Sequence, residues 1–137
     1  MAHWLFKTEP SEYSYADLAR DKRVVWEGVS NATALIHLRA VRKGDTVIVY
    51  HSGKDKAAIG LAEVTRGAYA DPKLGDDKRV VVDLKPVRAF ANRVPLADFR
   101  GDAVLKTTEL VRITRLSVMP LTPAHHARVL ERAGVKA

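Results

Sequence analysis

The sequence of 137 residues contains no cysteine. This absence excludes a disulfide framework, a cysteine-based zinc site and a thiol nucleophile. Phosphate-loop motifs are also missing, because Gly53-Lys54 lacks the upstream glycine that a P-loop requires and G-x-G-x-x-G does not occur. Nucleoside triphosphates and dinucleotides are therefore poor candidate ligands, and we expect no cofactor and no metal.

Long hydrophobic runs are absent as well. No apolar stretch approaches the roughly 18–20 residues of a membrane span. The first ten residues lack the apolar core and the small-residue cleavage site of a signal peptide. We therefore expect a cytoplasmic protein, or a nuclear one in a eukaryote, that does not associate with membranes. Without repeats or a linker-like segment, residues 1–137 are predicted to form a single domain.

Negative charge is the scarcer sign. The chain has 23 Lys+Arg against 16 Asp+Glu, a formal net charge of +7. The surplus is uneven, because residues 1–70 carry 10 basic and 8 acidic side chains whereas residues 71–137 carry 13 and 8. Such a balance is compatible with a polyanionic partner.

Hydrophobic residues make up 47% of the chain, so a folded core is expected. β-Branched and aromatic runs predict strands at His3–Lys7, Val24–Trp26, Thr46–His51, Ala58–Ala68, Arg79–Phe90 and Ser117–Leu121. Capping residues predict helices at Ser14–Arg20, Ala32–Val41, Leu96–Arg100 and from Pro123 to Gly134. No assignment is made for Leu110–Leu116.

Several details of these elements are testable. Asn31 should cap the second helix and Gly44 should close it. In the fourth strand, Ile59, Leu61 and Val64 are expected to face inward. Asp71–Lys78 is predicted to form a solvated hairpin loop. Pro86 indicates a bulge or an edge position in the strand that follows.

The helices lie near the ends of the chain and the long strands in its middle. This order favours an α+β domain around a strongly curved, mostly antiparallel sheet. A doubly wound parallel sheet would need strands and helices to alternate throughout, and they do not.

Few side chains suggest catalysis. Gly28-Val29-Ser30-Asn31-Ala32 differs by one residue from a nucleophile elbow, but a helix start explains it more simply. His51 and Ser52 adjoin at a strand end, where neighbouring side chains point to opposite faces, so a pocket rim or a structural histidine are the alternatives. His125-His126 lacks the helical spacing of a metal site and is expected on a solvated face.

Seven short motifs, spread in order over nearly the whole chain, closely resemble the EVE domain family. They are Trp4-Leu5-Phe6-Lys7-Thr8-Glu9-Pro10, Tyr13-Ser14, Trp26-Glu27-Gly28-Val29-Ser30-Asn31, Gly44-Asp45, Tyr50-His51-Ser52, Gly60-Leu61-Ala62-Glu63-Val64 and Arg115-Leu116-Ser117-Val118-Met119-Pro120. The resemblance implies a PUA-like fold, with a curved sheet closed into a small barrel and flanked by helices. It also implies kinship with YTH domains, and a module that reads a modified base, such as a modified cytosine in DNA or a modified RNA base.

The same resemblance implies a base pocket. Trp26 is similar to the aromatic residue that stacks on the recognised base in YTH domains. The remaining expected pocket residues are Lys7, Thr8, Ser30, Asn31, Tyr50, His51 and Ser52. Asn31 would either cap its helix or hydrogen-bond a base edge. Two departures from the family pattern stand out: Ser30 replaces the usual arginine, and the loop Asp71–Lys78 is shorter than in many members.

A pocket of this kind takes a base only when that base is flipped out or single-stranded. Affinity for the backbone would then come from the basic residues, chiefly those in residues 71–137, and selectivity from the first half of the chain. Two other readings remain open. One is a small hydrolase or base-modifying enzyme that uses Ser30, His51 or Ser52, and the other is a small-ligand-binding domain. The sequence leaves oligomeric state and the identity of the base undetermined.

Overall fold

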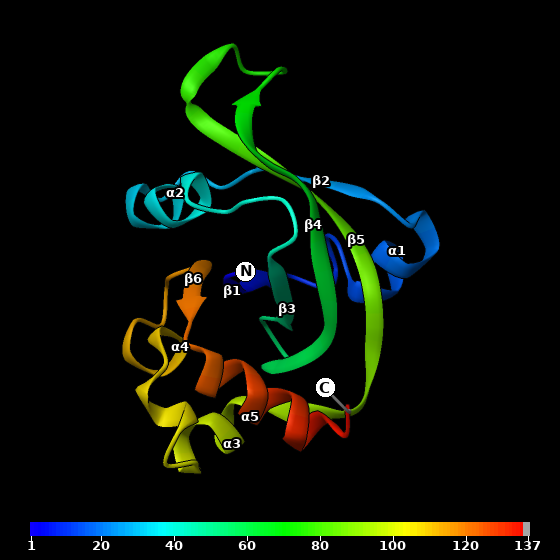
Figure 1. Ribbon diagram of the computed structural model, residues 1–137, viewed down its shortest axis with the longest axis vertical. Coiled ribbons are helices and arrows are strands. Elements are labelled where there is room, and N and C mark those ends of the chain that lie inside the picture. The colour runs from blue at the N-terminus through cyan, green and yellow to red at the C-terminus, as the bar shows by residue number, and fades with distance from the viewer. Residues whose placement is uncertain (136–137) are drawn as a thin grey trace.

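The computed structural model describes residues 1–135 and is built around one six-stranded sheet (Figure 1). Its strands are β1 (His3–Thr8), β2 (Val24–Trp26), β3 (Thr46–His51), β4 (Ala57–Asp71), β5 (Asp76–Pro95) and β6 (Val118–Leu121). The helices are α1 (Tyr15–Asp21), α2 (Ala32–Arg39), α3 (Leu96–Gly101), the 3₁₀ turn η1 (Leu105–Thr107), α4 (Glu109–Arg112) and α5 (Pro123–Ala133). The predicted α+β class is confirmed.

The strand order is β2-β5-β4-β3-β1-β6, and the pairs are antiparallel except for β1 with β3. β1 and β3 are the most deeply buried strands, and Leu5, Phe6, Val47 and Ile48 are fully inaccessible. Burial on both faces explains why these strands read as continuous apolar runs instead of alternating.

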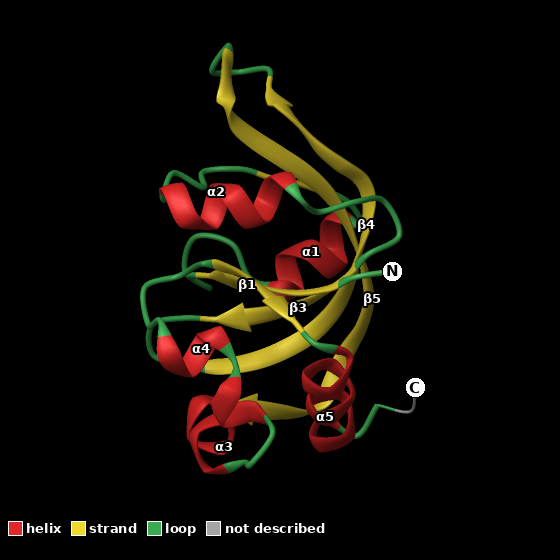
Figure 2. Cartoon of the chain, turned by 60° about the vertical axis from the view of Figure 1, so that its left-hand side comes forward, coloured by secondary structure: helices red, strands yellow, loops and turns green. Residues whose placement is uncertain are grey.

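The expected closed barrel is wrong. Over residues 1–135, β2 pairs only with β5 and β6 pairs only with β1, so the sheet is open. These two edge strands have 3 and 4 residues. β4 and β5 bend strongly around the inner strands (Figure 2), which gives curvature without closure.

β4 and β5 form a long hairpin that projects beyond the rest of the sheet (Figures 1 and 2). The connection is shorter than predicted, since β4 continues to Asp71 and β5 already begins at Asp76. Pro86 lies beyond Leu84, the last residue of β5 that pairs with β2, and next to a register shift in the β4–β5 ladder. Both features suit a proline, which has no backbone N–H to donate to a neighbouring strand.

The prediction of which β4 side chains face the core is partly wrong. Val64 is buried, but Ile59 and Leu61 are only partly buried. The small residues next to them in the strand face the core instead. At Gly60 there is no room for a side chain, because a Cβ atom there would lie 2.5 Å from the Tyr15 ring. The Tyr15 side chain thus fills the space that a large side chain on this strand would otherwise occupy.

The helix ends follow local capping chemistry. Ser14 and Asp17 form the predicted capping box of α1, and Thr122 and Gly134 bound α5 as predicted. α2 is shorter than predicted: it ends at Arg39 with Ala40 as its C-cap, so Gly44 does not close it. Within residues 1–135, no helix is long and apolar enough to cross a membrane.

Candidate base-binding pocket

A hollow lies where β1 and β2 end and α2 begins. Its volume is about 590 Å³, within the range of about 300–1,000 Å³ that is usual for ligand sites. The residues around it are Lys7, Thr8, Glu9, Glu12, Tyr13, Val24, Val25, Trp26, Glu27, Gly28, Val29, Ser30, Asn31 and Ser117. Five of the eight predicted site residues therefore meet here: Lys7, Thr8, Trp26, Ser30 and Asn31.

Trp26 belongs to both the core and the pocket. Its side chain is only 7% exposed, and its ring lies 5.6 Å from that of Phe6. The Tyr13 ring meets it edge-on, with the centroids 6.4 Å apart. Burial and the neighbouring Asp21 raise the pKa of Tyr13 to about 12, so its hydroxyl stays protonated and donates to Asp21 Oδ2 at 3.0 Å. Trp26 is thus held rigidly by two aromatic neighbours.

Asn31 has the capping role that the sequence allowed, and it also lines the pocket. Its side-chain oxygen accepts a hydrogen bond from the Ala34 backbone N–H at 3.0 Å, which caps α2. The amide NH₂ group of the same side chain has two donors, which make no hydrogen bond to the described part of the chain. Ser30, which stands beside it where the family usually has arginine, is exposed and supplies a hydroxyl without charge.

The end of β1 forms another wall. Burial lowers the pKa of Lys7, whose ammonium donates to the Thr114 carbonyl at 2.7 Å and lies 5.9 Å from the centre of the Tyr50 ring. Thr8 donates its hydroxyl to the Tyr13 carbonyl at 2.6 Å. These contacts connect the end of β1 to the segments that carry Thr114 and Tyr13.

The sequence did not predict the carboxylates that line this pocket. Glu9, Glu12 and Glu27 line the pocket against a single lysine, so the lining is acidic and lacks a basic rim. Glu27 pairs with Lys73 of the hairpin at 3.1 Å, and Glu9 accepts from the Ser11 backbone and hydroxyl at 3.3 Å. Only Glu9 and Glu27 stood within the family-like motifs, and nothing in their spacing indicated convergence.

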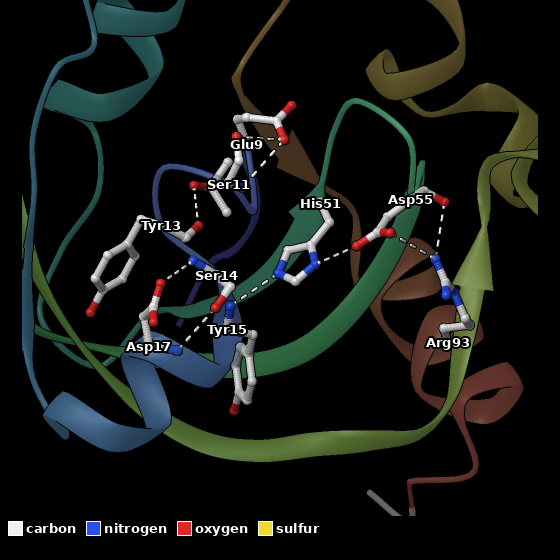
Figure 3. Close-up of polar contacts among 10 residues, drawn as sticks. Glu9, Ser11, Tyr13, Ser14, Tyr15, Asp17, His51, Asp55 and Arg93 are labelled. Atoms are coloured by element: carbon white, nitrogen blue, oxygen red, sulfur yellow. Dashed lines mark hydrogen bonds and ion pairs between the residues drawn. The ribbon is translucent and has the colours of Figure 1, made fainter.

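Tyr50, His51 and Ser52 lie outside the pocket lining. The His51 side chain turns inward (Figure 3), where Nε2 accepts from the Tyr15 backbone N–H at 3.0 Å. Nδ1 therefore carries the proton and donates to Asp55 Oδ2, also at 3.0 Å. Asp55 in turn lies 3.6 Å from Arg93.

This arrangement does not suit nucleophilic catalysis. A serine nucleophile needs a histidine nitrogen free to accept its proton. Both nitrogens of His51 are occupied, and within residues 1–135 no hydroxyl hydrogen-bonds to this ring. Ser52 instead continues the ladder, with its backbone N–H donating to the Thr8 carbonyl at 2.9 Å. Tyr50 is buried against Phe99.

The two adjacent histidines of α5 are not on a solvated face, contrary to expectation. His125 is 9% exposed, with Nδ1 accepting from the Thr122 backbone N–H at 3.2 Å. His126 stacks on His3 with ring centroids 3.9 Å apart. Among the residues that the structure describes, no group of three or more side chains could hold a metal ion.

Comparison with known proteins connects this architecture to a family. The EVE domain profile matches residues 2–132. Human thymocyte nuclear protein 1 is 31% identical over 155 residues, which cover 88% of this chain and 69% of that protein.

Two solved structures share the fold. An NMR structure of a protein from Rhodopseudomonas palustris superposes with a TM-score of 0.93 at 35% identity, covering 98% of this chain and 94% of the other. The human THYN1 protein, solved in complex with 5-methylcytosine-containing DNA, superposes with a TM-score of 0.88 at 29% identity, with both chains fully covered. The chain belongs to the EVE domain family.

Proposed function

We propose that this protein is a non-enzymatic module that binds nucleic acid and takes an unstacked modified cytosine into the pocket at Trp26. The observation that carries the proposal is the pocket itself, which combines a rigid tryptophan with unspent donors and acceptors. The solved complex of human THYN1 with 5-methylcytosine-containing DNA supports the ligand class.

Stacking and burial supply part of the affinity. The pocket must repay the few kcal/mol that unstacking a base costs. A base that contacts an aromatic ring recovers about 1–3 kcal/mol. The apolar side chains of Val24, Val25 and Val29 offer a surface for a methyl group. Burial of one methyl is worth about 0.8 kcal/mol, or roughly fourfold in affinity, so modification alone is selected modestly.

Hydrogen bonds select the base more strongly. Cytosine presents an exocyclic amino donor, and carboxylates such as Glu9, Glu12 and Glu27 are its natural acceptors. The Asn31 amide and the Ser30 hydroxyl can donate to the carbonyl side of the base. Thymine presents a carbonyl where cytosine has its amino group, so it would face a carboxylate with no proton between them. Such unmade hydrogen bonds reject the wrong base effectively.

The test compares single-stranded oligonucleotides that differ at one central position, by fluorescence anisotropy at fixed salt. The position carries 5-methylcytosine, cytosine, thymine or no base. We expect 5-methylcytosine to bind several-fold more tightly than cytosine, and thymine to bind at least tenfold more weakly than 5-methylcytosine. Equal affinity for all four would contradict the proposal.

The tryptophan is tested by Trp26→Leu, which keeps an apolar side chain in a position that packs on Phe6. Loss of stacking should weaken binding of the 5-methylcytosine oligonucleotide by tenfold or more. Val87→Ala is the control, because Val87 is 53% exposed on β5 and lies outside the pocket lining. Circular dichroism shows whether each variant is folded.

A further inference from the structure

The pocket offers only one basic side chain to the phosphates of its proposed ligand. Its lining carries Glu9, Glu12 and Glu27 but only Lys7, whose ammonium already donates to the Thr114 carbonyl. Each nucleotide brings a negative charge, and affinity for nucleic acid depends mostly on neutralising these phosphates. The net charge of +7 must therefore act at another surface.

A second hollow, of about 340 Å³, lies at the other end of α2. Its lining residues are Arg39, Val41, Arg42, Lys43, Gly67 and Ala68. Three of the six are cations and none is acidic. We call Arg39, Arg42 and Lys43 the basic turn.

The backbone of the basic turn is fixed from the inside. Asp45 is 4% exposed, and its carboxylate accepts hydrogen bonds from the Ala2 backbone, the Trp4 indole and the Arg42 backbone at 2.9–3.0 Å. Burial alone would raise the pKa of Asp45, but these three donors lower it, so the carboxylate stays ionised. Asp45 therefore fixes the backbone of the turn and forms no ion pair with the side chains of the basic turn in the described part of the chain.

β4 holds the same turn from the other side. The Ala68 backbone N–H donates to the Val41 carbonyl at 3.3 Å. Gly67 forms a floor without a side chain, since a Cβ atom there would lie 3.1 Å from the Val41 oxygen and 3.2 Å from Arg42 Cα. Arg39 Nη2 donates to the Lys78 carbonyl of β5 at 2.9 Å, which joins the end of α2 to the hairpin.

The other two cations of the basic turn are available to bind an anion. Arg42 and Lys43 are exposed, and within residues 1–135 their side chains make no hydrogen bond or ion pair. Two free cations on a fixed backbone lose little backbone freedom when they bind an anion, because the turn is already ordered.

We propose that the basic turn binds the phosphate backbone of the nucleic acid whose base enters the pocket. The proposal rests on the proposed function. α2, labelled in Figure 2, links the two sites, since Asn31 caps its start at the pocket and Arg39 is its last residue and part of the basic turn. Its 8 residues span about 12 Å, or three to four stacked nucleotides at about 3.4 Å each. The phosphates held by the turn are therefore about three to four nucleotides from the recognised base.

The test is the double variant R42Q/K43Q, measured with the 5-methylcytosine and cytosine oligonucleotides over a series of salt concentrations. At low salt we expect both affinities to fall at least tenfold and by the same factor, leaving the preference for the modified base unchanged. The slope of log affinity against log salt should become shallower by about two, one for each lost cation. R42K/K43R keeps both charges and should retain the wild-type slope.

A matched control removes the same charge elsewhere. Lys54 in the β3–β4 turn and Lys106 on η1 are both exposed and line neither hollow. K54Q/K106Q should leave the slope nearly unchanged. An equal loss in the control would assign the effect to net charge and overturn the proposal. The proposal would also be overturned if the wild type preferred the modified base but R42Q/K43Q kept the wild-type affinity and salt slope. A wild type without base preference would instead contradict the proposed function.

Discussion

His51 Nε2 accepts a hydrogen bond from the backbone N–H of Tyr15 at 3.0 Å. Tyr15 is the first residue of α1, so this N–H has no partner within the helix. A side chain from the end of β3 thereby satisfies the start of a helix 36 residues earlier in the chain. The contact assigns His51 a structural role, next to a pocket to which it does not contribute.

His51→Ala should therefore reduce stability more than binding. It leaves the Tyr15 N–H buried without a partner and opens a cavity, which costs roughly 2–3 kcal/mol. Urea unfolding measures this loss. At temperatures where the variant is folded, its affinity for the 5-methylcytosine oligonucleotide should stay within about twofold of wild type. Ser52→Ala is the control, with almost no change expected in either quantity. A stable His51→Ala protein that has lost binding would return His51 to the site.

Local chemistry was the most predictable part of this fold. The caps at Ser14, Asn31 and Thr122 were identified from the sequence, because each depends on residues within three positions of it. The facing of Ile59 and Leu61 was not, because it depends on the Tyr15 ring, which contacts the strand from a distant segment.

The site divides in the same way. The family-like motif grouped Trp26, Ser30 and Asn31, and the structure brings all three to one hollow because they lie close together between the end of β2 and the start of α2. His51 was expected in the same pocket but lies outside its lining, because its ring contacts the N-terminus of α1, and the sequence does not show that the two lie side by side. The acidic character of the pocket was missed because Glu9, Glu12 and Glu27 come from separate segments that only the fold brings together.

Asn31→Ser separates capping from recognition. Serine is as good an N-cap as asparagine, so α2 should keep its stability within about 0.5 kcal/mol. The variant removes the amide donors from the pocket, and binding of the 5-methylcytosine oligonucleotide should weaken about tenfold. Anisotropy titration and thermal unfolding together check both effects. Full affinity in a stable variant would exclude the amide from base contact.

Asp102→Asn should destabilise the C-terminal part of the fold. The Asp102 side chain is 1% exposed and accepts from Arg128 Nε at 2.7 Å and Arg132 Nε at 2.9 Å, which attaches α5 to the loop after α3. These partners, with two backbone N–H groups, hold the pKa of Asp102 well below its usual range. Both arginines donate to Oδ2 and the two backbone N–H groups donate to Oδ1. An amide has one oxygen and cannot accept from both pairs, so the melting temperature should fall by roughly 10 °C.

The control for Asp102 is Asp98→Asn. Asp98 lies 3.7 Å from Arg132 and is 43% exposed, so its ion pair is worth little. The melting temperature of this variant should stay within about 2 °C of wild type. Equal effects of the two substitutions would show that burial at Asp102 does not matter.

The stacked pair of His3 and His126 predicts an acid sensitivity. Burial, followed by repulsion from His3, lowers the pKa of His126 to about 4 from its ordinary 6.5, and His126 Nδ1 is buried with no partner in the part of the chain that is described. The unfolded chain takes up a proton near pH 6.5, whereas the folded protein resists protonation until about pH 4. Stability from the neutral ring is thus complete above pH 6.5 and is lost as the pH falls towards 4.

His126→Leu removes this titration and keeps an apolar contact with the His3 ring. Between pH 7.5 and pH 5, wild type should lose roughly 1 kcal/mol more unfolding free energy than the variant, after allowance for the half of the ring that is near solvent. Urea unfolding at the two pH values measures the difference, and groups common to both proteins cancel. Parallel pH profiles would show that His126 is protonated as easily in the folded protein as in the unfolded chain. The oligonucleotide affinity at pH 7.5 should be unchanged, because neither histidine lines the pocket or the basic turn.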